Sequence, residues 1–225
     1  MCCSIKIVSI EGNIGSGKST LLSNLKSHFK DNQNIVFLKE PVDEWGKIQD
    51  ENGTTILEKF YADQTKYSFS FQMMAYISRL KLLKDIFKKH KNNNNLIIIT
   101  ERSLYTDKMV FAKMLFDSEK IEKINYQIYL SWFDEFIEDY PVNKIIYVKT
   151  SSEVCHKRIN IRHRTGENNI PIDYLTECDK YHDQMLLSSD KVCNDIIIFD
   201  GINDIYTNTV ILDEWISTIQ SFLQL

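Results

Sequence analysis

The sequence Ile5-Lys6-Ile7-Val8-Ser9-Ile10-Glu11-Gly12-Asn13-Ile14-Gly15-Ser16-Gly17-Lys18-Ser19-Thr20 joins an apolar run to a glycine-rich turn and the start of a helical pattern. This order of strand, turn and helix is typical of a phosphate-binding loop, in which backbone N–H groups surround the β-phosphate at a helix N-terminus. Lys18 is expected to reach the β- and γ-phosphates, and Ser19 to ligate Mg²⁺. The predicted nucleoside triphosphate site comprises Gly12, Asn13, Ile14, Gly15, Ser16, Gly17, Lys18, Ser19 and Thr20.

The composition limits the classes of protein to which the chain can belong. Its 225 residues, 43% of them hydrophobic, can bury one sizeable core, which favours a single domain over residues 1–225. A net charge of -4 argues against a nucleic-acid or membrane-surface partner, because both require a dominant basic field. No apolar run approaches membrane-spanning length, and the first strand begins by Ile5, so we expect neither a signal nor a transit peptide.

Cysteine usage agrees with an intracellular protein. The spacing of the cysteines includes no C-x-x-C pair and no even framework, which argues against a zinc site or a disulfide scaffold. We therefore expect free thiols and a cytoplasmic location. The five cysteines are Cys2, Cys3, Cys155, Cys178 and Cys193.

Five short apolar runs alternate with longer segments of helical period. The runs are rich in β-branched residues and show little polar alternation, as expected for parallel strands buried on both faces. The pattern predicts an α/β fold with helices on both faces of the sheet. The predicted strands are 5–10, 35–38, 96–100, 144–149 and 196–199. The predicted helices are 18–30, 67–89, 105–116, 125–139, 152–161, 172–187 and 205–223.

Charged residues follow the second, third and fourth predicted strands. The carboxyl ends of parallel strands meet at one edge of the sheet, where ligands of such folds bind. Phosphoryl transfer to a hydroxyl requires a base near that hydroxyl, a metal between the phosphates and cations on the transferring group. The residues that can fill these roles in turn are Glu40, Glu101 with Ser19, and Arg158, Arg162 and Arg164.

Five motifs carry a resemblance to a known family. They are Gly12 to Thr20, Glu40-Pro41-Val42 with Trp45, Phe71-Gln72 followed by Ser78-Arg79, Glu101-Arg102-Ser103, and Arg162-His163-Arg164. In this order and spacing the chain resembles the deoxyribonucleoside kinases over nearly its whole length. The resemblance implies a P-loop kinase fold with a five-stranded parallel sheet, an arginine-rich lid, and Mg²⁺ with ATP. It further implies that Glu40 is the general base toward the 5′-hydroxyl of a deoxynucleoside, while Arg102 holds the reacting end and Glu101 helps hold Mg²⁺.

The same resemblance implies roles for residues in the second half of the chain. The arginines of the lid, about residues 158–170, would close over the donor phosphates, and Arg158 and Arg162 share a helix face because they lie four residues apart. Tyr61 and Glu167 would bond the 3′-hydroxyl of the sugar. Phe199 and Asp200, with Asn203, are expected to form a loop against the adenine of ATP.

A candidate base pocket lies on the long helix predicted at 67–89. Gln72, Ala75 and Arg79 occupy positions i, i+3 and i+7, so their side chains can face one pocket. The glutamine amide recognises a base without choosing it, because it offers both a donor and an acceptor. The combination of Arg79 and Asp107 resembles that in family members that prefer deoxycytidine and purine deoxynucleosides. We therefore expect thymidine to be a poor substrate. The expected walls are Val42, Trp45, Phe71 and Phe111, with Phe111 stacking on the base.

Three other functions share parts of this pattern. A thymidylate kinase would have the same phosphate loop, but the 5′-phosphate of its substrate would be repelled by Glu40. A kinase-like scaffold without catalysis is disfavoured by the intact Lys18, Glu40 and Arg102. A switch or motor NTPase would need a mechanical partner surface and usually a Walker-B aspartate, whereas the third strand here leads into Glu101. The family resemblance also suggests a homodimer.

Overall fold

The computed structural model of the protein describes residues 5–93, 95–164, 166–167 and 170–225. Its centre is a five-stranded parallel sheet in the order β2-β3-β1-β4-β5. The strands are β1 (Lys6–Glu11), β2 (Ile35–Leu38), β3 (Ile97–Glu101), β4 (Val142–Lys149) and β5 (Ile196–Asp200). The predicted α/β P-loop kinase fold is confirmed, because all five predicted strands are present in one parallel sheet.

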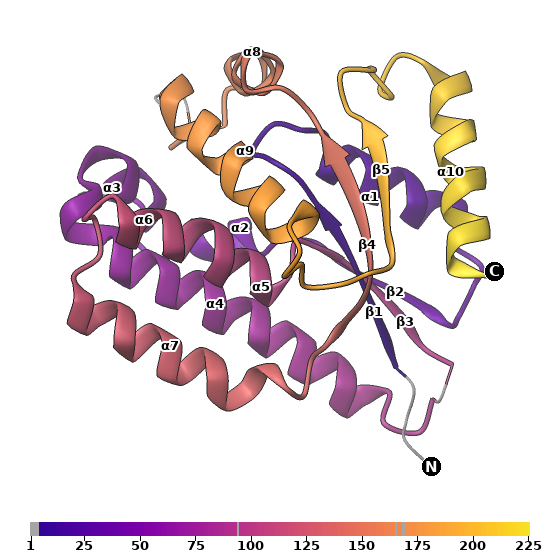
Figure 1. The fold of residues 1–225 in the computed structure, drawn as a ribbon, viewed down its shortest axis with the longest axis horizontal. Helices are drawn as coiled ribbons and strands as arrows, with labels where there is room; N and C mark the ends of the chain where they lie inside the picture. The colour runs from indigo at the N-terminus through magenta and orange to yellow at the C-terminus, as the bar shows by residue number, and fades with distance from the viewer. Residues whose placement is uncertain (1–4, 94, 165, 168–169) are drawn as a thin grey trace.

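Helices cover both faces of this sheet (Figure 1). Helices α1 (Lys18–His28) and α10 (Thr209–Leu223) pack on one face. Helices α4 (Gln64–Lys89), α7 (Lys123–Ile137) and α9 (Ile172–Leu187) pack on the other face. The remaining helices are α2 (Val42–Trp45), α3 (Ile56–Ala62), α5 (Leu104–Thr106), α6 (Lys113–Asp117) and α8 (Ser152–Arg162). None of the helices that the structure describes has the length and apolarity needed to span a bilayer.

The central strand β1 is buried on both of its faces. Val8 and Ile10 pack into the core that α1 and α10 complete, whereas Ile7 packs with Tyr76 of α4 on the opposite side. Side chains alternate between faces along a strand, so Ile7, Ser9 and Glu11 all point toward the α4 side. This double burial explains the nearly continuous apolar character of the run, and it fixes the point at which the glycine-rich turn leaves the sheet.

Besides shifts of up to three residues at the ends of α1, α4, α7 and α8, three parts of the helical prediction differ from the structure. Helix α10 begins at Thr209 rather than at residue 205, because Asn208 caps it with a side-chain oxygen that accepts from the N–H of Ile211 at 3.3 Å. The predicted helix 105–116 contains a π-helical turn, Asp107–Ala112, between α5 and α6. The short helices α2 and α3 were not predicted, since neither is long enough to show a hydrophobic period. Cys2 and Cys3, and lid residues 165, 168 and 169, lie outside the described residues.

Candidate active site

The glycine-rich turn has a backbone that only glycine can follow. Gly12 and Gly15 have φ values of 142° and 81°, in the region that L side chains rarely adopt. A Cβ atom on Gly12 would lie 2.5 Å from the carbonyl oxygen of Val148, and one on Gly15 would lie 2.6 Å from that of Cys155. These short distances explain why the motif requires glycine at both positions. Because no side chain covers the turn there, its backbone N–H groups can approach a phosphate.

Lys18 lies at the start of α1 and is almost completely buried, with 4% of its surface exposed. Its Nζ donates to the carbonyl oxygen of Asn13 at 2.6 Å, and the Asn13 amide donates to that of Leu175 at 2.8 Å. Burial, followed by the charge of Arg102, lowers the pKa of Lys18 to about 7. A phosphate anion next to this amine would favour its charged form, so the position suits the role that the motif predicts.

Ser19 and Glu101 meet at the carboxyl edge of the sheet. The hydroxyl of Ser19 donates to Oε1 of Glu101, and Oε2 of Glu101 accepts from the backbone N–H of Glu40 at 3.5 Å. Mg²⁺ prefers oxygen ligands and usually keeps several waters when it binds substrate phosphates. A hydroxyl and a carboxylate fit that requirement, although the described residues contain no cluster of three or more His, Cys, Asp or Glu that could hold a metal alone.

Glu40 is held between two buried arginines. Its carboxylate accepts from Nη1 of Arg102 at 2.9 and 2.8 Å and from Nη2 of Arg79 at 3.0 Å. Burial alone would raise the pKa of Glu40, but Arg102, Arg79 and Lys18 outweigh it and lower the pKa to about 2. The carboxylate is therefore ionised at neutral pH, and its position is fixed from two sides.

Arg102 has hydrogen-bond donors that pair with no other described residue. Its Nε and Nη2 atoms are buried without a hydrogen-bond partner among the described residues, although most buried polar atoms in proteins are paired. Its guanidinium lies over the ring of Phe111, 5.1 Å from the centroid. The unpaired donors and the neighbouring Lys18 make this part of the site suited to an anionic group.

The predicted base-recognition residues lie beside the two arginines. Nε of Arg79 donates to Oδ2 of Asp107 at 2.9 Å, and its Nη1 donates to the carbonyl oxygen of Glu101 at 2.6 Å. Burial raises the pKa of Asp107 to about 6, against the opposing effect of Arg79. Gln72 and Ala75 come from the same face of α4 and are buried. The Gln72 amide has no hydrogen-bond partner within the described part of the chain, so it is available to a ligand.

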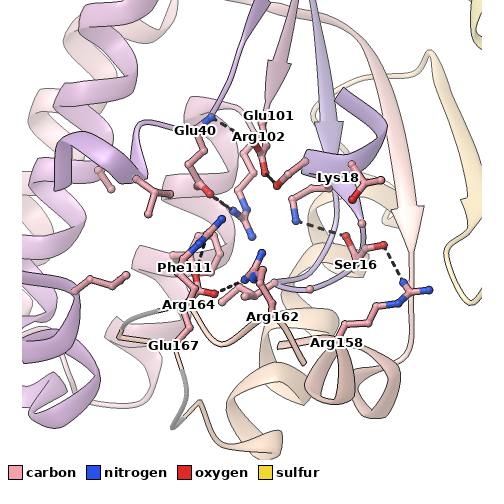
Figure 2. A pocket seen from close by; sticks show the side chains of 18 of the residues that line it. Ser16, Lys18, Glu40, Glu101, Arg102, Phe111, Arg158, Arg162, Arg164 and Glu167 are labelled. Atoms are coloured by element: carbon pink, nitrogen blue, oxygen red, sulfur yellow. Dashed lines mark hydrogen bonds and ion pairs between the residues drawn. The ribbon is translucent and has the colours of Figure 1, made fainter. Parts of the chain in front are cut away.

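One cavity of about 610 Å³ joins these groups to the phosphate loop. Figure 2 shows Lys18, Arg102 and Arg162 pointing into the same space from different elements. The cavity is lined by many of the residues predicted for the substrate, namely Glu40, Val42, Trp45, Tyr61, Phe71, Gln72, Ala75, Arg102, Asp107, Phe111 and Glu167. Arg79 lies behind this lining, where it holds Glu40 and Asp107. The volume is in the range of small-molecule sites.

The arginines predicted for the lid divide into two groups. Nη1 of Arg158 donates to the carbonyl oxygens of Ser16 at 3.3 Å and Gly201 at 2.7 Å, which ties α8 to the phosphate loop. Arg162 and Arg164 instead bind the two carboxylate oxygens of Glu167 (Figure 2). All three arginines line the cavity, but only the second group is paired with a carboxylate that a substrate could replace.

Tyr61 lies on α3 and contributes a hydroxyl to the same cavity. Its ring meets that of Tyr174 edge-on at 6.1 Å. Burial, followed by the charge of Glu167, raises the pKa of Tyr61 well above its ordinary value. The hydroxyl therefore remains protonated and can donate to a sugar oxygen.

Asp200 was predicted to lie in a loop against the adenine of ATP, together with Phe199 and Asn203. Asp200 does not line the cavity, and its carboxylate accepts from the N–H of Ile202 at 3.0 Å within its own turn. Other residues that the sequence did not single out form the lining: Leu57, Phe60, Ile161, Asp204, Ile205, Tyr206 and Trp215. They come from α3, from the exposed end of α8, from the loop that follows β5, and from α10. No local sequence pattern distinguishes them from ordinary core or loop residues.

Comparison with known proteins places this geometry in a family. The sequence model described as "Deoxynucleoside kinase" matches residues 8–224. The chain belongs to the deoxynucleoside kinase family. The predicted family resemblance is thereby confirmed, and the protein is a phosphotransferase of an ATP-dependent kinase family.

Individual relatives of this kinase agree with that assignment. It is 36% identical over 189 residues to a probable deoxycytidine kinase of fowlpox virus, covering 83% of this chain and 74% of the relative. It is 31% identical over 227 residues to the deoxycytidine kinase of Homo sapiens, covering 93% of this chain and 85% of the relative. It is 30% identical over 195 residues to a mitochondrial deoxyguanosine kinase of Xenopus laevis, covering 80% of this chain and 71% of the relative.

Proposed function

We propose that the chain is a single-domain kinase that transfers the γ-phosphoryl group of ATP to the 5′-hydroxyl of deoxycytidine or a purine deoxynucleoside in preference to thymidine. The observation that carries the proposal is the Glu40 carboxylate, held by Arg102 and Arg79 on the wall of a cavity whose other end is the phosphate loop. The names of the relatives, deoxycytidine and deoxyguanosine kinases, support the same substrate class.

In this mechanism Glu40 acts as the general base. A primary alcohol hardly ionises at neutral pH, so its proton moves to Glu40 as the new P–O bond forms rather than beforehand. Because the pKa of Glu40 is about 2, the carboxylate is a weak base, and proton transfer is late in the reaction. Lys18 and the unpaired donors of Arg102 stabilise the charge of the transferring group.

Mg²⁺ completes the proposed site with ATP. Ser19 and Glu101 would hold it beside the phosphate loop, where the ion would supply positive charge to offset that of the phosphates. The hydrogen bond from Ser19 to Glu101 keeps the two oxygen ligands together. Removal of free Mg²⁺ with a chelator is expected to abolish turnover, and its return is expected to restore it.

The discrimination against thymidine rests on Asp107. Its side chain lines the cavity and is paired with Arg79, and in the proposed binding mode the 5-methyl group of thymine would have to pack against this pair. A methyl group placed there would remove water from a charged pair without replacing its hydrogen bonds, which is unfavourable. Gln72 and the small Ala75 are compatible with cytosine and purine bases alike.

The first test is turnover of MgATP by the purified protein with each of the four natural deoxynucleosides, with thymidine monophosphate, and with no acceptor. The proposal predicts strong activity with deoxycytidine or a purine deoxynucleoside and weak activity with thymidine. Dominant thymidine turnover would refute the argument from Asp107 but keep the kinase. Activity with the monophosphate alone would favour a thymidylate kinase, and turnover with no acceptor would contradict the transfer reaction.

We also propose a homodimer that forms through α4 and α7, which lie side by side (Figure 1). Ile124, Ile128 and Trp132 recur every four residues on α7 and are 64%, 43% and 51% exposed. Ile77 on α4 is 51% exposed. An exposed apolar stripe of this kind is typical of an interface, and a two-fold dimer would cover it with its own copy.

A cytoplasmic location is likewise proposed. The described cysteines, Cys155, Cys178 and Cys193, are free thiols, which is the usual state in a reducing compartment. Fractionation of cells with an antibody to the protein would test the location, and recovery only in an organelle fraction would contradict it.

A further inference from the structure

Glu11 is a fully buried carboxylate to which neither the phosphate loop nor the acceptor site assigns a role. It is the last residue of β1 and has no exposed surface. Its Oε1 accepts from the hydroxyl of Ser9 at 2.6 Å, and its Oε2 accepts from the hydroxyl of Thr106 at 2.6 Å. No cation pairs with this carboxylate in the part of the chain that the structure describes.

The hydrogen bond to Thr106 joins Glu11 to the cap of α5. Ser103 and Thr106 form a capping box, in which the N–H of Ser103 donates to Oγ1 of Thr106 at 3.2 Å and the N–H of Thr106 donates to Oγ of Ser103 at 3.3 Å. The Thr106 hydroxyl gives its hydrogen to Glu11, so the Ser103 hydroxyl, 3.0 Å away, must donate to Thr106. The acceptor Glu11 therefore sets the direction of the whole chain of hydrogen bonds.

The capping box lies between two residues of the acceptor site. Arg102 immediately precedes it and has a φ of 63°, a left-handed conformation that costs free energy for a residue other than glycine. Asp107 immediately follows Thr106 and is paired with Arg79. The backbone N–H of Arg102 donates to the carbonyl oxygen of Ile10 at 2.9 Å, next to Glu11. A strained residue of this kind persists only when its surroundings hold it.

We propose that Glu11 is a positioning residue for phosphoryl transfer: through Thr106 and Ser103 it holds the left-handed turn at Arg102, and thereby the alignment of Arg102 with Glu40. The inference rests on the proposed kinase function. Burial of a carboxylate that is bonded only to hydroxyl groups is unfavourable for folding, and such unfavourable features are expected where a site must be held in one geometry. The role differs from binding, because Glu11 does not line the cavity.

Four variants test this role, with wild-type turnover measured first in the same assay. Thr106→Val keeps the shape of the side chain and removes the hydroxyl, and Glu11→Gln keeps the shape and removes the charge. Thr106→Ser restores the hydroxyl. Ser9→Ala is the matched control, because it removes a hydrogen bond of the same 2.6 Å length from the same carboxylate without touching the cap of α5.

The expected result separates positioning from general destabilisation. Thr106→Val and Glu11→Gln should lower kcat by about tenfold to a hundredfold, since a misplacement of about 1 Å can cost that much. Affinity for MgATP, measured by calorimetry, should change by less than about twofold, because only the acceptor end is displaced. Thr106→Ser and Ser9→Ala should remain within about threefold of the wild-type kcat.

Two results would overturn the role of Glu11 while leaving the kinase function intact. One is a wild-type kcat in Thr106→Val, and the other is a loss in Ser9→Ala equal to that in Thr106→Val. If Thr106→Val does not fold, Ser103→Ala takes its place, since it removes both hydrogen bonds of the Ser103 hydroxyl to Thr106 and so weakens the capping box next to Arg102; it should lower kcat in the same direction. A wild-type protein without turnover on any deoxynucleoside would instead overturn the proposed function, and this inference with it.

Discussion

Substitution of Glu40 by glutamine tests the proposed reaction most directly. The change keeps the shape of the side chain but removes the charge that faces Arg102 and Arg79. The glutamine amide can accept one hydrogen bond from Arg102, but its NH₂ group cannot accept another. Arg79 keeps its bonds to Asp107 and to the carbonyl oxygen of Glu101, whereas Arg102 loses its ion-pair partner.

The size of the effect follows from this geometry. General base catalysis contributes about 10²-fold to 10⁴-fold, with the larger values for bases whose pKa lies near the working pH. Because the pKa of Glu40 is about 2, we expect the lower end, a fall in kcat of about a hundredfold, or about 2.7 kcal/mol in activation free energy. Breaking a buried ion pair should also lower the free energy of unfolding by about 3 kcal/mol.

The assay compares turnover with MgATP binding in the same preparation. Steady-state kcat is measured at saturating deoxynucleoside and MgATP, and MgATP affinity is measured by calorimetry. The matched control is Glu44→Gln, four residues away on α2, where the carboxylate is exposed and, among the described residues, pairs with Lys47 alone. A role for Glu40 as general base is refuted if Glu40→Gln turns over within about threefold of wild type, or if its loss of turnover is matched by an equal loss of MgATP affinity.

Three further predictions follow from other parts of the structure. Replacement of the ion pair by Arg79→Met with Asp107→Ala should raise the ratio of kcat/KM for thymidine to that for deoxycytidine by at least about tenfold, and an unchanged ratio would contradict the role of the pair. Burial, followed by the charge of Arg102, lowers the pKa of His182 from 6.5 to about 3 in the folded protein. Below about pH 6.5 the unfolded chain therefore binds a proton that the folded protein does not, and the free energy of unfolding falls as the pH drops. Denaturant unfolding of His182→Asn between pH 4 and pH 6 should lack this loss, about 1.4 kcal/mol per pH unit, and parallel curves for the two proteins would refute it. Trp132→Glu on α7 should shift the protein from dimer to monomer in light scattering, and a dimer of unchanged stability would exclude this interface.

Much of the architecture could be predicted because its signals are local. Glycine spacing after an apolar run specifies a phosphate loop wherever it occurs, and undivided β-branched runs specify strands buried on both faces. Parallel strands bring their carboxyl ends to one edge, so Glu40 and Glu101 could be placed together without knowledge of distances. The family motifs then supplied the order of the elements between them.

The sequence by itself determined the phosphate loop, the parallel sheet and the charged residues at its edge, because each depends on neighbouring residues and on rules common to all such sheets. Only the tertiary structure decided how those residues pair. The contact between Glu11 and Thr106 spans 95 positions, and Arg158 donates to the carbonyl oxygen of Gly201 rather than to a carboxylate. Contacts of this kind depend on how distant segments pack against one another, and no local periodicity encodes the separation of two side chains that the fold brings together.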